Sequence, residues 1–260
     1  MKKTSILVYS LMSIVILTSC TLKKCNLENA QVHFTTIKTD SLLPGGLQIE
    51  FTYPDSADSA SLELLQKMFI ENVLGEMYAE LTPEQALDAY VAEYMQFLKE
   101  QEQDSSNVPT SYYYNQINNT ILLNESGFIS SVAHSETYIG GAHGWTKNTG
   151  FVINLATNKL LTEKDFAGEK YEQNMNHLLV RKIMEKNEVA TLEELENLGY
   201  DTAATCPNGN FSLDKKGLTY YFNEYEIAPH SLGIIEVSIP YNELEVYISG
   251  ESSLSCLISK

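Results

Sequence analysis

The order of extended and helical segments is the feature that most limits the fold of this chain. Extended segments follow one another through short turns, and helical segments are grouped in separate blocks. The run over residues 47–53 is the clearest case, because Leu47, Ile49 and Phe51 alternate with polar residues, as in a half-buried strand. Similar runs occur in the second half of the chain, at Tyr112–Leu123, Phe128–Ile139, Phe151–Leu155, Phe211–Leu213, Leu218–Phe222 and Ile234–Ile239. This order predicts an α+β fold of two packed α/β subdomains, with mainly antiparallel sheets that are covered by helices.

The helical blocks are marked by their periodicity and by their capping residues. Apolar residues recur every three or four positions over residues 62–77, which forms one apolar stripe. The next helix has a clear start, because a proline follows Thr82 and Gln85 comes three residues after the threonine. Helices are also expected over Tyr171–Lys186 and after the capping box that begins at Thr191.

A polar segment over residues 101–109 divides the chain into two parts. We predict a smaller N-terminal α+β domain over residues 31–108 and a larger C-terminal α+β domain over residues 110–258. The larger domain contains the motif Gly-Gly-Ala-His-Gly.

Residues 1–19 have the layout of a secretory signal peptide, with two lysines, an apolar run over Ile6–Leu17 and small residues before a cysteine. The apolar run has about twelve residues, whereas a helix that spans a bilayer needs about twenty. The ending Leu17-Thr18-Ser19-Cys20 resembles the lipobox of bacterial lipoproteins, in which the cysteine receives acyl chains such as palmitate. We therefore expect Cys20 to be the lipidated first residue of the mature chain, with residues 20–30 as a tether to the membrane.

The residues after Cys20 bear on the final location. Thr21, Leu22 and two lysines follow it, with no early run of Asp or Glu like the export tag of some surface lipoproteins. This favours an exported lipoprotein that is anchored in the outer membrane and faces the periplasm, while surface exposure stays open.

The charge of the chain excludes some partners and favours others. The formal net charge is −17, and removal of Lys2 and Lys3 with the signal peptide leaves 15 basic against 34 acidic residues, a net of −19. Nucleic-acid binding and a basic patch for anionic lipid both need clustered Lys and Arg, so we expect neither. Acidic charge favours solubility and attracts cationic partners.

The cysteines allow one disulfide. Besides Cys20, the chain has Cys25, Cys206 and Cys256, and an exported protein meets an oxidising compartment. Three pairings stay open from the sequence. A Cys206–Cys256 disulfide is preferred, because Cys25 lies in the predicted tether.

A glycine-rich stretch is the most unusual part of the chain. It places a histidine between glycines, with aromatic residues on both sides: Tyr138, Gly140, Gly141, His143, Gly144 and Trp145. Glycines permit positive φ and close approach of the backbone. One interpretation is a tight turn in which His143 bonds to neighbouring backbone, and another is an exposed rim that contacts a ligand. A metal site is the least favoured, because His134 is not at a ligand spacing and H-E-x-x-H is missing.

Two separated motifs resemble those of a bacterial cell-envelope family of unknown function. The first is the glycine-rich stretch with the strand after it, and the second comprises Phe222–His230, Gly233 and Ile239–Leu244. The family includes the extracellular part of the lysozyme-sensing anti-sigma-V factor RsiV and the region before the catalytic domain of the peptidoglycan deacetylase PdaC. The resemblance adds Tyr225, Pro229 and Pro240 to the candidate residues. It also suggests that Tyr225, His230 and Tyr241 pack near the glycine turn.

These features predict a non-enzymatic binding or sensing module that uses no cofactor. The expected partners are the membrane, through the lipid, and a ligand that is either a cationic protein such as lysozyme or peptidoglycan. We find no deacetylase domain after Lys260 and no cytoplasmic segment before the anchor, so we expect the chain to lack the chemistry and the direct signalling of these relatives. The alternative is a cell-envelope hydrolase that uses His143 with a nearby carboxylate.

Overall fold

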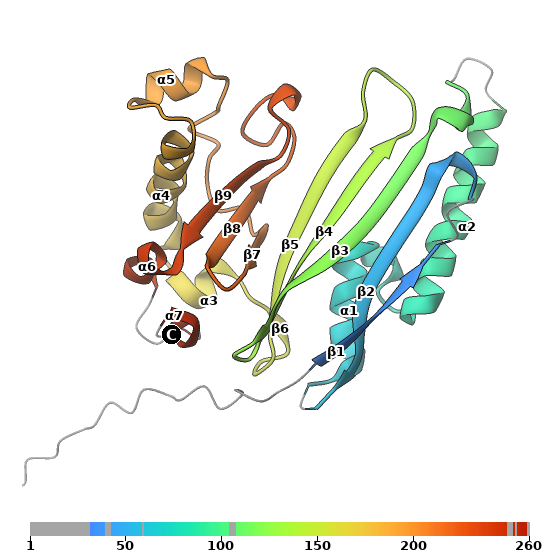
Figure 1. The fold of residues 1–260 in the computed structure, drawn as a ribbon, viewed down its shortest axis with the longest axis horizontal. Helices are drawn as coiled ribbons and strands as arrows, with labels where there is room; N and C mark the ends of the chain where they lie inside the picture. The colour runs from blue at the N-terminus through green and yellow to red at the C-terminus, as the bar shows by residue number, and fades with distance from the viewer. Residues whose placement is uncertain are drawn as a thin grey trace, which may run out of the picture.

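The computed structural model describes residues 32–39, 43–58, 60–103, 108–248, 252 and 254–258. The predicted signal peptide, the tether and Cys20 lie outside these residues. The described chain forms four layers, which are a pair of helices, a large sheet, a small sheet and a second group of helices (Figure 1). The predicted α+β class with mainly antiparallel sheets is therefore confirmed.

The large sheet has six strands in chain order: β1 (Val32–Lys38), β2 (Leu47–Ala57), β3 (Tyr114–Glu125), β4 (Phe128–Tyr138), β5 (Trp145–Asn154) and β6 (Lys159–Leu160). All neighbours are antiparallel except β2 and β3, which are parallel. A parallel pair needs a long crossover, and the helices α1 (Leu62–Val73) and α2 (Pro83–Glu102) supply it. Strands from both sides of residue 109 share this sheet, while the division into domains there stays a prediction.

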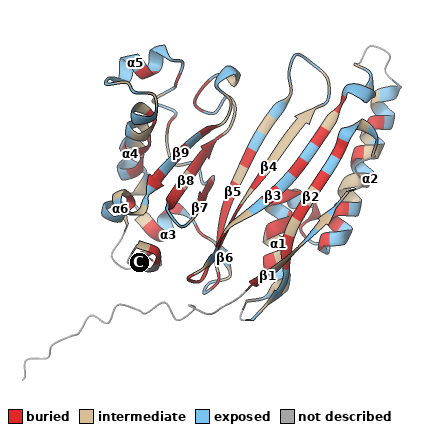
Figure 2. Cartoon of the chain, viewed as in Figure 1, coloured by how far each residue is buried: buried red, intermediate tan, exposed pale blue. Residues whose placement is uncertain are grey.

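Helices α1 and α2 cover one face of the large sheet (Figure 1). Buried and exposed residues alternate along β2 and β3, as Figure 2 shows, so every second side chain faces the helices. Ile49 and Phe51 are completely buried there. Phe69 of α1 packs edge to face on Phe151 of β5, with ring centroids 5.1 Å apart. The alternation predicted over residues 47–53 is confirmed.

The small sheet consists of β7 (Phe211–Leu213), β8 (Gly217–Phe222) and β9 (Ile235–Pro240), with antiparallel neighbours. The short helices α3 (Glu163–Ala167) and α6 (Tyr241–Leu244) and the longer α4 (Tyr171–Lys186) pack around it, and α5 (Leu192–Asn197) and α7 (Ser255–Ile258) follow α4 and α6 in the chain. Phe166, Phe211 and Tyr220 form the centre of this second core. Truncation of such a buried aromatic ring costs about 3–5 kcal/mol.

The two sheets contact each other directly at β5 and β7. Gly150 of β5 lies against the backbone of Phe211, and a Cβ at Gly150 would be 2.7 Å from the Phe211 carbonyl carbon. The Gly150 N–H donates to Asn210 Oδ1 at 2.7 Å, and Asn210 Nδ2 donates to the Asn148 carbonyl at 2.9 Å. The Asn148 N–H donates to Asn223 Oδ1 at 2.8 Å. Two asparagine side chains therefore cap the edge of β5 that β6 leaves uncovered.

The helix starts agree with those predicted from the sequence, and one predicted helix end does not. The capping boxes at Thr82 and Thr191 are both present, which confirms the predicted helix starts. The stripe predicted over residues 62–77 is wrong at its end, because α1 stops at Val73 and Gly75 has a φ of 126°. Met77 is consequently 71% exposed. The described residues also form five 3-10 turns: η1 (Pro44–Gly46), η2 (Glu76–Tyr78), η3 (Thr110–Tyr112), η4 (His230–Leu232) and η5 (Glu245–Tyr247).

Two further features concern the membrane and the cysteines. Within the described ranges, none of the helices combines the length and the apolar character that crossing a bilayer requires. Cys206 has a free and partly exposed thiol, and the side chain of Cys256 lies outside the described residues. The structure therefore does not show the Cys206–Cys256 disulfide, and this pairing stays a prediction.

Candidate functional site

The glycine-rich stretch forms the turn between β4 and β5. Gly140 and Gly141 have φ values of 99° and 97°, in the region that favours glycine. The Tyr138 hydroxyl donates to the Gly141 carbonyl at 3.1 Å, which closes the turn. A Cβ at Gly144 would lie 2.8 Å from the Tyr114 hydroxyl and 2.9 Å from a backbone carbonyl, so a side chain does not fit there. The turn thus holds His143 and Trp145 at the end of the large sheet.

A second loop, between β8 and β9, lies beside this turn. Asn223 starts the loop and is fixed to β5 by its bond to Asn148. Tyr225 has a φ of 67°, and its N–H donates to the Ala228 carbonyl at 3.1 Å. Pro229 precedes η4, lies near Gly199 and sets His230 at the first position of that turn.

The two loops meet through four aromatic rings, His143, Trp145, Tyr225 and His230, which we name the paired-loop cluster. The His143 and His230 rings stack with centroids 3.9 Å apart and planes at 20°. Tyr225 is nearly parallel to His230, at 16° and 5.9 Å. Trp145 is tilted by 52° against Tyr225, with centroids 5.6 Å apart. Residues that are about eighty positions apart in the sequence therefore form one surface.

The cluster is open to solvent and has a defined hydrogen-bond pattern. Trp145 is 55% exposed and Tyr225 is 54% exposed. The Gly144 carbonyl lies 2.9 Å from His143 Nδ1 and can only accept, so this nitrogen carries the proton in the hydrogen bond. In the neutral ring, Nε2 is then the acceptor for the Tyr225 hydroxyl at 3.3 Å. Both loops thus contribute to the hydrogen bonds of His143.

A buried carboxylate lies next to the cluster. The Glu224 side chain is only 5% exposed, and its Oε2 is 2.8 Å from His230 Nδ1. This contact is not aligned as a hydrogen bond, and neither atom has another hydrogen-bond partner. Among the ion pairs of the described residues, Glu224 is paired with this histidine and with no Lys or Arg. The structure therefore places a buried carboxylate and a partly exposed imidazole together beside the cluster.

The structure brings most of the predicted candidate residues together. The residues of the glycine-rich stretch share one turn, Tyr225 joins them in the cluster, and Pro229 is next to His230. Pro240 and Tyr241 lie elsewhere, because Pro240 pairs with Gly217 at the other end of β8 and Tyr241 donates to the Asp214 carbonyl. The suggestion that Tyr241 packs near the glycine turn is therefore wrong. Sequence reasoning missed Glu224, although it directly precedes Tyr225 within the second motif.

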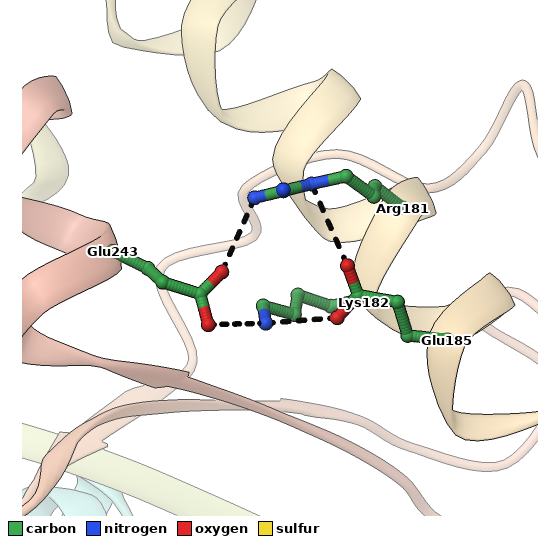
Figure 3. A network of polar contacts seen from close by, with 4 residues as sticks. All are labelled: Arg181, Lys182, Glu185 and Glu243. Atoms are coloured by element: carbon green, nitrogen blue, oxygen red, sulfur yellow. Dashed lines mark hydrogen bonds and ion pairs between the residues drawn. The ribbon is translucent and has the colours of Figure 1, made fainter.

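The end of the second motif has a structural role, which Figure 3 shows. Glu243 of α6 accepts from Lys182 at 2.6 Å and from Arg181 at 3.3 Å, both on α4. Lys182 also contacts Glu185 at 2.9 Å. Burial lowers the pKa of Lys182, but the hydrogen bonds to Glu243 and Glu185 outweigh it, so this pKa is raised above its ordinary value. This network fixes α6 on α4 at a distance from the cluster.

A groove on the surface lies apart from the cluster. This groove of about 450 Å³ lies along α4 and the start of α5, and its lining includes Asn176, Val180 and Leu192. It contains none of the predicted motif residues. In the part of the chain that the structure describes, no group of three or more His, Cys, Asp or Glu side chains is arranged to hold a metal ion.

The fold is shared with structures of a family of unknown function. A crystal structure of a DUF3298 family member from Bacteroides fragilis NCTC 9343 has a TM-score of 0.78 and 27% identity, and the match covers 90% of this chain and 100% of that chain. A DUF3298 family protein from Pseudomonas aeruginosa PAO1 shares the fold, with a TM-score of 0.54 and 16% identity over 85% of this chain and 94% of that chain. The chain thus shares its fold with solved structures of the DUF3298 family.

Family profiles identify the two parts of the chain. Residues 46–146 match the profile described as deacetylase PdaC, and residues 159–242 match the profile described as a protein of unknown function (DUF3298). A comparison with curated proteins gives no match. The chain therefore carries a PdaC-type region followed by a DUF3298 region, and the resemblance inferred from the two motifs is confirmed. The glycine-rich stretch lies at the end of the first region, and Glu224, Tyr225 and His230 lie in the second.

Proposed function

We propose that this chain is a cell-envelope lipoprotein whose folded part is a non-enzymatic binding module, with the paired-loop cluster as its ligand site. The observation that carries this proposal is the meeting of two distant motifs, which exposes Trp145 and Tyr225 side by side. Tyr and Trp offer a large contact area with few rotatable bonds, and they dominate the binding energy of many interfaces. Both regions of the chain match cell-envelope families, which supports a ligand at the envelope.

The anchor is proposed from the sequence of the signal peptide. Cys20 would carry acyl chains and hold the folded part at the outer membrane, facing the periplasm, and multiple acylation gives firm anchoring. Mass spectrometry of the mature N-terminus checks this. We expect an acylated Cys20 as the first residue, and an unmodified N-terminus would contradict the lipoprotein proposal.

Two ligands are proposed, a cationic protein such as lysozyme and the glycan of peptidoglycan. The family likeness supports both, and the net charge of −17 supports a cationic protein through electrostatic attraction. The test measures binding of the full chain, in a non-ionic detergent, to lysozyme and to peptidoglycan fragments. Trp145→Ala and Tyr225→Ala should each weaken binding about thirtyfold or more, because central aromatic residues contribute about 2 kcal/mol or more when they are hot spots.

Leu192→Ala is the matched control for these variants. Leu192 is 52% exposed on α5 and lies in the groove rather than in the cluster, so its truncation should leave binding unchanged. Equal losses from Leu192→Ala and Trp145→Ala would place the ligand elsewhere. No binding of either ligand would contradict this choice of ligands.

A second candidate function is a cell-envelope hydrolase, and the contact between Glu224 and His230 favours it. A carboxylate beside an imidazole is a common arrangement for general acid–base catalysis. The proposed pair differs from the predicted one, because the polar partners recorded for His143 are the Gly144 carbonyl and the Tyr225 hydroxyl. The test incubates peptidoglycan with the full chain and measures released fragments. If the full chain releases fragments and both Glu224→Gln and His230→Ala abolish this release, the result would support the hydrolase and contradict a purely binding role.

A further inference from the structure

We propose that the paired-loop cluster is a cation-accepting site that takes an organic ammonium group against the faces of Trp145 and Tyr225. Glu224, buried next to the cluster, supplies the opposite charge. This inference rests on the proposed function and adds the chemical class of the ligand, which is a primary or quaternary ammonium.

The shape of the cluster suits a cation. The His230 ring is nearly parallel to both His143 and Tyr225, while Trp145 is tilted by 59° against His143 and by 52° against Tyr225. Two aromatic faces that are not parallel form a corner, and each of Trp145 and Tyr225 is more than half exposed. A cation within about 6 Å of an aromatic face is attracted by the ring quadrupole, most strongly for Trp. A small ammonium group can contact both faces of such a corner.

The charge next to the cluster is also suitable. The Glu224 side chain is 5% exposed, and its Oε2 lies 2.8 Å from His230 Nδ1 without an aligned hydrogen bond. A buried carboxylate without full compensation acts strongly on its surroundings, because the local dielectric constant is low. An ammonium group over the cluster would lower the cost of this buried charge. The net charge of −17 also raises the concentration of cations near the surface.

The backbone at Tyr225 points to a ligand as well. A φ of 67° is uncommon for a bulky residue and stores strain, which proteins keep mainly at functional sites. The strain is not explained by burial of this side chain, because Tyr225 is 54% exposed. The fold therefore holds an exposed aromatic ring in place against its backbone preference. Contact between the Tyr225 ring and a ligand would account for this arrangement.

The experiment uses the natural reporter of the site. Trp145 is the one tryptophan of the sequence, so tryptophan fluorescence of the full chain reports on the cluster alone. The chain, in a non-ionic detergent, is titrated with tetramethylammonium and with glucosamine at constant ionic strength. N-Acetylglucosamine is the neutral control, because the acetyl group removes the charge and keeps the sugar ring. We expect a saturable change with the two ammonium compounds and a much weaker one with the neutral sugar.

The variants separate ring contact from charge. Tyr225→Leu keeps an apolar side chain but removes the aromatic face, and it should weaken ammonium binding about two- to thirtyfold. Glu224→Gln removes the buried charge at nearly constant shape and should weaken ammonium binding without affecting the neutral sugar. Glu226→Gln is the matched control, since Glu226 is an exposed carboxylate two residues away. It should have the smaller effect.

A further variant shows whether loss of binding is only loss of structure. Tyr225→Gly relieves the strained backbone, which offsets part of the ring contacts that it removes, so its urea midpoint of unfolding should be higher than that of Tyr225→Ala, although both variants lose ammonium binding. Equal responses to charged and neutral sugars, or no response to either ammonium compound, would overturn the cation site. If the chain binds lysozyme or peptidoglycan but not ammonium, the proposed function stands and this inference fails. If it binds ammonium but neither envelope ligand, the inference stands and the proposed ligands are wrong.

Discussion

The contact between the two sheets predicts whether Gly150→Ala stabilises or destabilises the protein. Gly150 has no positive φ, so alanine fits its backbone conformation. In that case Gly→Ala normally stabilises a protein by about 0.4–1 kcal/mol, because the unfolded chain loses freedom. We predict the opposite for Gly150→Ala, since the small sheet leaves no space for a methyl group.

The expected magnitude follows from the distances. The new Cβ would lie 2.7 Å and 2.8 Å from the carbonyl carbon and oxygen of Phe211, and 2.8 Å from the Tyr221 ring. Two of these atoms belong to the backbone, so β7 must move away, at a typical overpacking cost of about 1–3 kcal/mol. The movement also weakens the hydrogen bond from Gly150 to Asn210, which contributes about 1 kcal/mol. With the entropy gain subtracted, we expect a net loss of about 1–3.5 kcal/mol.

Urea unfolding of the full chain in detergent, followed by circular dichroism, measures this loss. The midpoint should fall by about 1 M, since slopes of about 1–3 kcal/mol per M are typical in urea. Lys147→Ala on the same strand is the control, because Lys147 is exposed and its truncation should change stability by less than about 0.5 kcal/mol. An unchanged or higher midpoint for Gly150→Ala would refute the close contact between the sheets.

Three other perturbations test separate parts of the structure by the same unfolding assay. Thr191→Ala removes the side chain that caps α5 and should cost about 0.5–2 kcal/mol, and an unchanged midpoint would contradict the capping box. Glu243→Gln removes a partner of the partly buried Lys182 and should cost about 1–3 kcal/mol, less at high salt; a salt-independent loss would point to packing instead. Burial and the Glu84 carboxylate raise the pKa of Tyr53 to about 12, from an ordinary value of 10.0. The unfolded chain therefore loses this proton first, so stability should fall as the pH rises above 10, and Tyr53→Phe should reduce that slope.

The sequence predicts local elements well and their assembly less well. Alternation over residues 47–53 and the two capping boxes depend on neighbouring residues, and the structure contains them as predicted. The parallel pairing of β2 with β3, across residue 109, depends on contacts between distant segments, which no local pattern reveals. The end of α1 was missed because the positive φ of Gly75 outweighs an apolar stripe that continues to Met77.

In the candidate site, too, local features could be predicted from the sequence and contacts between distant residues could not. Periodicity in the sequence does not predict that His143 lies next to Tyr225. Only the family resemblance suggests that they are close. The resemblance did not separate the two halves of the second motif, of which one joins the cluster and the other binds α4 through Glu243. Glu224 escaped notice because acidic residues are abundant in this chain, and only burial distinguishes one of them.

The hydrogen bond from β5 to Asn223 connects the loop between β8 and β9 with the protection of a strand edge. Asn223 holds the edge of β5, and the next residue in the chain is Glu224 of the candidate site. A ligand that moved this loop away would break that bond and leave the Asn148 N–H of β5 without its partner. Unpaired strand edges are templates on which other chains can add a strand. Movement of the loop between β8 and β9 would thus expose part of the β5 edge to pairing with another chain, so we expect a ligand to bind without displacing Asn223.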